Sequence, residues 1–149
     1  GLIDAPIFRS DKNRTRMQVS DKPQARSSVT TFNVLERFES GLKDNGFTLV
    51  ECKLYSGRTH QIRVHLTGED LPLIGDQLYR GRAPGIAVKV ENFLEFHRQA
   101  LHASRLGLIH PATGEEMEWF VEPPEDMIVL MEQLGFGPWD RPVTVFEKK

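Results

Sequence analysis

The sequence predicts an α+β domain in which peripheral helices flank a largely antiparallel, mixed sheet. Two segments, residues 27–55 and residues 101–121, each have the pattern of a strand, a turn and a returning strand. A third segment, residues 123–135, begins with prolines and acidic residues and continues with apolar residues at helical spacing. Because consecutive strands joined by short turns pair antiparallel, these observations favour an antiparallel sheet with helices at its periphery.

The first residues predict extended chain and a basic loop. We expect extended chain at Ile3 and Pro6-Ile7, where the chain enters the domain. We expect a short strand at residues 17–19. Residues 11–16 are polar and basic, which is typical of a solvated loop.

Residues 27–55 predict a long hairpin. β-branched and aromatic residues dominate residues 29–38, Lys43-Asp44-Asn45-Gly46 is a turn signal, and residues 47–55 form the returning strand. This hairpin leads directly into the densest cluster of polar residues in the chain, residues 56–66.

The polar cluster at residues 56–66 follows a predicted strand and contains a glycine that interrupts it. Gly57 interrupts the strand, and we expect Thr59 to cap a short helix that runs toward Leu66. A rigid strand that ends in a turn and a helix start is a common place for a binding site, because free N–H groups at the helix start favour anions.

Two interpretations of this cluster remain open. In the first, Ile62 and Leu66 are the buried face of a surface helix and the charged residues face solvent. In the second, Arg63 lies between Ile62 and Val64, which exclude water, and its guanidinium forks onto a carboxylate and keeps it ionised. The residues that would converge on such a carboxylate or on a polyanion are Arg58, Thr59, His60 and Arg63.

The loop after the cluster carries further candidates. Residues 71–79 are interrupted by Pro72 and Gly75, so they predict a loop in which Asp76 and Tyr79 brace the site from behind. We expect no metal site, because His60 and His65 are five residues apart and no cysteine or carboxylate cluster completes a ligand set.

The remaining chain predicts alternating elements and a tail. We expect His102 to be a packed or hydrogen-bonded histidine. The expected elements are a short helix over residues 90–100, strands over 101–110 and 117–121 with a turn at 111–114, a helix over 127–134 that Gly135 ends, and a tail over 136–149.

Composition limits the function classes. The 149 residues suit one domain, and the net charge of −2 argues weakly against nucleic-acid binding when only the sum is considered. Residues 1–30 carry six basic and three acidic side chains, whereas residues 111–149 carry three basic and nine acidic ones. The basic part is therefore able to face phosphates, although ordinary surface charge explains the same counts.

Composition also bears on location. The sequence contains no run of about 18 apolar residues, so we expect no membrane span. It has no charged and then apolar N-terminus, so we expect no secretory signal. The single cysteine, Cys52, cannot form an internal disulfide, which favours a reducing, cytoplasmic setting.

Four ordered blocks resemble the RluA-type pseudouridine synthases, and most closely their RluD-like, large-subunit branch. The blocks are Gly57-Arg58-Thr59-His60-Gln61-Ile62-Arg63-Val64-His65, residues 72–79, residues 98–103 and residues 110–115. The resemblance covers nearly the whole chain and thins after about Leu134. It implies that residues 1–149 are the C-terminal portion of a catalytic domain, with half of its bent, mixed sheet.

The resemblance implies an isomerase that converts uridine to pseudouridine in structured RNA, with large-subunit ribosomal RNA as the expected partner and no metal or organic cofactor. The target base flips out of its stack, an aspartate attacks, and the base rotates and rejoins through carbon. Arg63 matches the family arginine that pairs with this aspartate, with Ile62, Val64 and Tyr79 as the pocket wall and Asp76 and His102 behind it. The implied RNA contacts are Gly57, Arg58, Thr59, His60, Gln61 and Arg80.

One departure from the family pattern is decisive for the expected activity. The catalytic aspartate of the family lies in an His-Arg-Leu-Asp-type motif upstream of the Gly57 block, and this sequence has neither that motif nor the upstream tyrosine that stacks on the base. Asp76 belongs to a different block, so it is a poor substitute. We therefore expect a fragment or a truncated product whose partners are RNA and a missing N-terminal half. A non-catalytic RNA-binding module, a truncated inactive product and a plain interaction domain remain alternatives.

Overall fold

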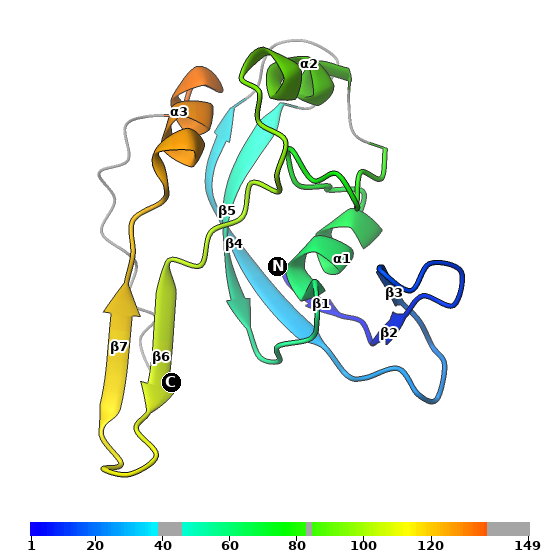
Figure 1. The fold of residues 1–149 in the computed structure, drawn as a ribbon, viewed down its shortest axis with the longest axis vertical. Helices are drawn as coiled ribbons and strands as arrows, with labels where there is room; N and C mark the ends of the chain where they lie inside the picture. Colours follow the sequence, from blue (N-terminus) through cyan, green and yellow to red (C-terminus); the bar gives the residue numbers. More distant parts are fainter. Residues whose placement is uncertain (39–45, 83–84, 137–149) are drawn as a thin grey trace. The chain divides into compact units, whose positions relative to one another are not determined.

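The computed structural model describes residues 1–38, 46–82 and 85–136, and the chain divides into two compact units, Gly1–Ala100 and Leu101–Lys149. The described residues form antiparallel strand pairs and three helices (Figure 1), so the predicted α+β class is confirmed. None of these helices has the length and apolar character that a bilayer crossing requires.

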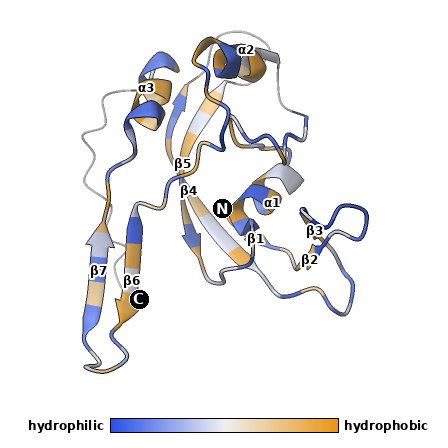
Figure 2. Ribbon diagram, in the orientation of Figure 1, coloured by the Kyte–Doolittle hydropathy of each residue, from blue (hydrophilic) through white to orange (hydrophobic). Residues whose placement is uncertain are grey.

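The first unit is built on the predicted long hairpin. Strands β4 (Val29–Phe38) and β5 (Phe47–Leu54) pair antiparallel, and β1 (Leu2–Asp4) adds to the other edge of β4 in the order β1-β4-β5. The register of β4 shifts between Val34 and Glu36, which is the signature of a bulge. The two strands carry hydrophobic bands interrupted by polar ones (Figure 2). Of the predicted turn, Lys43-Asp44-Asn45-Gly46, only Gly46 lies within the described residues.

A second, smaller hairpin supports the helix that carries the polar cluster. Strands β2 (Ile7–Arg9) and β3 (Met17–Val19) pair antiparallel, and helix α1 (Gln61–Gly68) contacts both β3 and β4. Figure 1 shows α1 lying between the small hairpin and the β4–β5 pair. The buried residues Ile7, Val64 and Tyr79 form a core cluster there, and Met17 and Leu78 pack against it.

The predicted cap of one helix and both predicted bounds of another are wrong. Thr59 is exposed and does not cap α1; the N-cap residue is His60, in the left-handed conformation with φ 57° and without a side-chain cap. The helix expected over residues 90–100 is α2 (Gly85–Phe93), which begins earlier and stops earlier. It stops because Glu95 takes a positive φ of 52° and the Phe96 amide bonds back to the Glu91 carbonyl.

The second unit contains the other predicted hairpin and the predicted C-terminal helix. Strands β6 (Arg105–Ile109) and β7 (Glu116–Phe120) pair antiparallel across a turn that ends at Gly114, with φ 73°. Helix α3 (Glu125–Gln133) follows Pro124 and carries two acidic residues in its first turn, and Gly135 at φ 87° follows its end, as the sequence predicts. Phe136 is buried, and the rest of the expected tail lies outside the described residues.

Candidate active site

The turn that precedes α1 is held by one buried amide. The Gln61 Oε1 accepts hydrogen bonds from the Ser56 hydroxyl at 2.8 Å and from the Arg58 amide at 3.0 Å. Its Nε2 donates to the Val29 carbonyl and to the Thr30 hydroxyl, both at 3.0 Å. Gln61 therefore ties the start of the helix to strand β4, which fixes the residues on either side of it in space.

His65 anchors the same helix one turn later. Its Nε2 lies 2.9 Å from the Ala5 carbonyl, which only accepts, so that nitrogen carries the proton. Its Nδ1 lies 2.9 Å from the fully buried Thr30 hydroxyl. The two ring nitrogens therefore tie α1 to strand β4 and to the residue that follows β1. Within the described residues, no group of three His, Cys, Asp or Glu side chains is placed to hold a metal.

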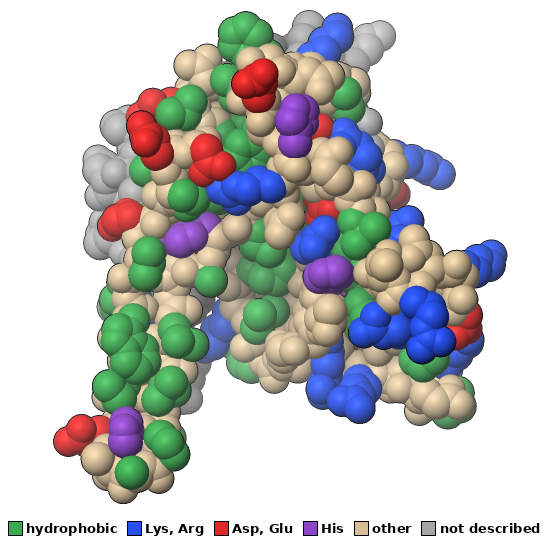
Figure 3. All heavy atoms as spheres, in the orientation of Figure 1, with side chains coloured by type: hydrophobic (Ala, Val, Ile, Leu, Met, Phe, Trp, Pro, Cys, Tyr) green, Lys and Arg blue, Asp and Glu red, His purple; other side chains and the backbone are tan. Residues whose placement is uncertain are grey.

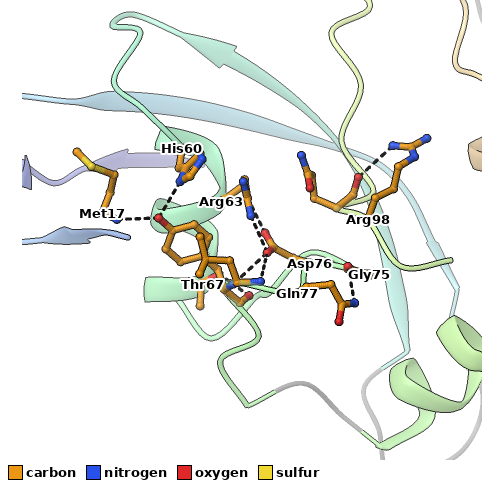
Figure 4. Close-up of polar contacts among 11 residues, drawn as sticks. Met17, His60, Arg63, Thr67, Gly75, Asp76, Gln77 and Arg98 are labelled. Carbon is orange, nitrogen blue, oxygen red and sulfur yellow. Dashed lines mark hydrogen bonds and ion pairs between the residues drawn. The ribbon is translucent and has the colours of Figure 1, made fainter. Parts of the chain in front are cut away.

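Arg63 and Asp76 form the central ion pair of the site. The Arg63 Nε and Nη2 donate to Asp76 Oδ2 at 2.7 Å and Oδ1 at 2.9 Å, a forked geometry in which the two side chains point toward each other (Figure 4). The Asp76 side chain has no exposed surface, and that of Arg63 is 12% exposed. Asp76 Oδ1 also accepts from the amides of Leu78 and Tyr79, both at 2.9 Å.

These contacts set the charge state of the pair. Burial is the largest influence on Asp76 and raises its pKa, but the hydrogen bonds from Arg63, Tyr79 and Leu78 outweigh it and hold the pKa below its ordinary value. The hydrogen bond from Asp76 is the main reason that the pKa of Arg63 is raised. Both groups are therefore charged at neutral pH, and no described residue accepts a hydrogen bond from Arg63 Nη1.

Tyr79 joins the ion pair to the small hairpin. Its buried hydroxyl accepts from the Met17 amide at 2.7 Å and lies 2.9 Å from His60 Nδ1. The guanidinium carbons of Arg63 and Arg16 lie 4.9 Å and 5.2 Å from the centre of its ring, within the range of cation–π attraction. The ring thus places His60 and two arginines in one neighbourhood.

A buried glutamate on α2 holds the loop that carries Asp76. Glu91 accepts from the Gly75 amide at 2.8 Å and from Arg80 Nη2 at 2.7 Å. Gly75 has φ 75°, and a Cβ atom there would lie 2.0 Å from the Arg98 carbonyl oxygen, so the loop passes close to its neighbour at a position that only glycine fits.

The structure brings some of the predicted residues together and leaves others apart. Arg63, Asp76, Tyr79 and His60 form one contact group, and Val64 packs in the core cluster with Tyr79, while Ile62 is half-buried. The Arg80 side chain forms an ion pair with Glu91. Gly57 and Thr59 are exposed, and Arg58 Nε reaches the Ser27 carbonyl at 3.3 Å. His102 lies in the second unit, where its Nε2 bonds the Val121 carbonyl at 2.8 Å.

Sequence reasoning missed the residues that hold these groups from behind. The supporting hydrogen bonds come from four residues that no sequence pattern distinguishes: the side chains of Glu91, Thr30 and Ser56, and the backbone amide of Met17.

A basic surface lies beside the site. Lys and Arg side chains gather over the β2–β3 hairpin (Figure 3). The described residues include a hollow in this hairpin lined by Phe8, Arg9, Ser10, Asp11 and Arg14.

Comparison with known proteins relates this arrangement to a family. A family model described as RNA pseudouridylate synthase matches residues 1–67, which include β1 to β5 and Arg63. Over 134 residues the chain is 46% identical to the uncharacterized RNA pseudouridine synthase YlyB of Bacillus subtilis. Over the part of these proteins that it spans, the chain is similar to the RNA pseudouridylate synthases. The RluA-type, RluD-like resemblance of the sequence is thereby confirmed.

Other pseudouridine synthases show the same similarity. The chain is 44% identical to ribosomal large subunit pseudouridine synthase D of Pseudomonas aeruginosa and 41% identical to that of Pasteurella multocida, each over 138 residues. These matches cover 90% of the chain but only 39% to 41% of the relatives' own length. Human RNA pseudouridylate synthase domain containing 1 shares the fold, with a TM-score of 0.61 at 23% identity over 93% of this chain and 60% of that protein.

Proposed function

We propose that this chain contributes the arginine-bearing side of the active site of an RNA pseudouridine synthase that acts on large-subunit ribosomal RNA. The observation that carries the proposal is the Arg63–Asp76 fork, which holds Arg63 in place against the same Tyr79 ring as Arg16, while no described residue accepts a hydrogen bond from Arg63 Nη1. The relatives named as ribosomal large subunit pseudouridine synthases support the choice of substrate.

The reaction exchanges one bond to the ribose for another. The N1–C1′ bond of uridine breaks, a C5–C1′ bond forms, the C5 hydrogen leaves to solvent and N1 regains a proton, so no cofactor or redox partner is required. In this proposal an aspartate outside the present chain attacks, and Arg63 Nη1 orients that carboxylate and keeps it ionised in a partly dry pocket. A complementary segment that carries this aspartate is consistent with relatives more than twice as long as this chain.

Asp76 does not act as the nucleophile in this scheme. Its side chain has no exposed surface, Oδ2 is bonded to Arg63, and Oδ1 accepts from Arg63 and two amides. A carboxylate saturated in this way is stabilised in its charged form and is a poor attacking group, because attack would require it to lose those bonds. Its role is to position Arg63.

The single experiment that tests the proposal measures tritium release from 5-tritiated uridine in ribosomal RNA transcripts. The chain is assayed alone and joined to the part of the Bacillus subtilis relative that it does not match. Release by the joined protein and none by the chain alone supports the proposal. Release by the chain alone would show that a carboxylate within it does the chemistry, and no release in either case would overturn the assignment.

The buried state of Asp76 also favours a second candidate, an RNA-binding module without catalysis. Such a module binds ribosomal RNA with strong salt dependence and releases no tritium even when joined to the complementary segment. For either candidate we propose a cytoplasmic location, in keeping with the single cysteine of the chain.

A further inference from the structure

His60 combines a strained backbone with a side chain that is fixed from behind. It takes a left-handed φ of 57°, which is uncommon for a residue other than glycine, and it does so at the start of α1 without making a side-chain cap. Such strain persists where the surrounding structure determines it, and it concentrates at functional sites. The supporting contact is the hydrogen bond between His60 Nδ1 and the Tyr79 hydroxyl.

The direction of that hydrogen bond follows from its neighbours. The Met17 amide can only donate, so one lone pair of the Tyr79 oxygen is occupied. Tyr79 is 2% exposed, and His60 Nδ1 is the one acceptor that the described residues offer to its hydroxyl hydrogen. The hydroxyl therefore donates to Nδ1, because a buried hydroxyl hydrogen without an acceptor is costly. The proton of the neutral imidazole then sits on Nε2.

The surroundings keep the imidazole uncharged. Burial contributes most to lowering its pKa, and the positive charges of Arg63 and Arg9 lower it further against the opposing effect of Asp76. His60 is half-buried, so its ring retains contact with solvent beside Arg63. Phosphate is bound more strongly by a charged ammonium or guanidinium group than by a neutral N–H group. The neutral N–H of His60 is therefore better suited to a neutral acceptor, such as a carbonyl oxygen, than to a phosphate.

We propose that His60 Nε2–H is a fixed, uncharged hydrogen-bond donor to a carbonyl oxygen of the RNA base that lies beside Arg63, with Tyr79 and the Met17 amide fixing its tautomer. This inference rests on the proposed function, because it assigns a base-reading residue to the same site. The arginines of the β2–β3 hairpin supply the contacts to phosphate, and His60 supplies a contact that depends on the base.

The tautomer is tested first, without RNA or activity. Two-bond proton–nitrogen NMR spectra of the chain with ¹⁵N-labelled histidine resolve its five histidines, and the His60→Gln variant assigns His60. We expect a neutral ring protonated on Nε2 at neutral pH, and a rise in the protonation midpoint of His60 in Tyr79→Phe. A ring protonated on Nδ1, or a charged ring at neutral pH, would overturn the inference whatever the chain binds.

The contact to the base is tested with a matched pair of variants. His60→Gln keeps a neutral donor, whereas His60→Leu is of similar size and backbone cost but has none. We expect His60→Leu to weaken binding of a uridine-containing oligonucleotide about tenfold, and His60→Gln to restore part of the loss. The loss should vanish on an oligonucleotide that lacks the base at that position, and the slope of log affinity against log salt should not change.

Three results separate the possible failures. An equal loss on the abasic oligonucleotide, or a shallower salt slope in His60→Leu, would mean that His60 contacts phosphate and the inference is wrong. An unchanged affinity in His60→Leu would also overturn it. If the unaltered chain binds no RNA, both the proposed function and the contact between His60 and the base are wrong. The NMR measurement of the His60 tautomer needs no RNA, so its result stands separately from that failure. His97→Gln, an exposed histidine of the first unit, is the control.

Discussion

Arg63 and Asp76, thirteen residues apart in the sequence, meet through two hydrogen bonds of 2.7 Å and 2.9 Å in a forked geometry. The carboxylate has no exposed surface, and it also receives the amides of Leu78 and Tyr79. One aspartate thereby fixes the direction of the guanidinium and the path of the loop around it.

Replacing Asp76 by asparagine should strongly destabilise the chain. The substitution leaves the Arg63 charge in a partly buried place without its partner, and breaking a buried pair from one side costs about 3–5 kcal/mol. Urea unfolding measures the loss. Glu69→Gln, an exposed acid after the same helix, is the control and should change stability little. Equal stability of both variants would show that the pair does not hold the loop.

The same pair should make stability depend on acid. Because the folded pKa of Asp76 is lowered, its contribution is fully present above the pKa of an unfolded aspartate, about 3.9, and is lost as the pH falls through the lower folded value. Unfolding free energies measured between neutral and acidic pH should fall less steeply in Asp76→Asn. Parallel curves for the two proteins would contradict a lowered pKa.

Gly75→Ala should be far more damaging than Gly57→Ala. At Gly75 a Cβ atom would lie 2.0 Å from the Arg98 carbonyl oxygen at a positive φ, whereas at Gly57 it would meet nothing within 4 Å. Strain and overlap at Gly75 together should cost about 2 kcal/mol or more. Thermal unfolding of the two variants gives the comparison, and similar melting temperatures would mean that the loop does not follow this path.

The thiol of Cys52 should react slowly at neutral pH. Burial, and to a lesser extent the neighbouring Glu51 carboxylate, raise its pKa to about 11, so little thiolate is present near pH 7. The rate of modification by a thiol reagent should rise with pH well beyond the range of an ordinary cysteine. The urea-unfolded chain is the control and should react quickly, and an equally fast reaction of the folded chain would refute the shift.

RNA binding should depend on salt through the small basic hairpin. Lys12 and Arg14 are exposed in its loop, so replacing both by alanine should weaken binding and reduce the salt slope by about 1–2. Lys89→Ala, an exposed lysine on α2, is the control. Affinity measured over a range of salt concentrations separates these cases, and equal slopes for all three proteins would remove the hairpin from the RNA interface.

Much of the fold was predictable because its signals are local. The β4–β5 pair follows from β-branched and aromatic runs, and α3 follows from Pro124, two acids and Gly135. The end of α2 was not predictable, because Glu95 adopts a positive φ without a glycine to signal it. The predicted cap at Thr59 is wrong because the side chain of Gln61, rather than a cap, holds the turn.

The site was predictable in type but not in partners. The sequence interpretation in which Arg63 forks onto a buried carboxylate is met by Asp76, a residue expected only to brace the site. Which acid an arginine selects depends on the tertiary path of the loop, and that path depends on the Glu91 contact with Gly75, which no sequence pattern indicates. The catalytic pairing of Arg63 with an aspartate of another segment stays a prediction.

The measurement that tests the central claim most directly is tritium release from 5-tritiated uridine by the joined protein with and without Arg63→Ala. We expect a loss of about 100-fold or more with little change in RNA affinity, because Arg63 acts on the attacking carboxylate rather than on RNA binding. Arg63→Lys keeps the charge but not the fork and should remain impaired. Undiminished release by Arg63→Ala would contradict the role of Arg63 in this account.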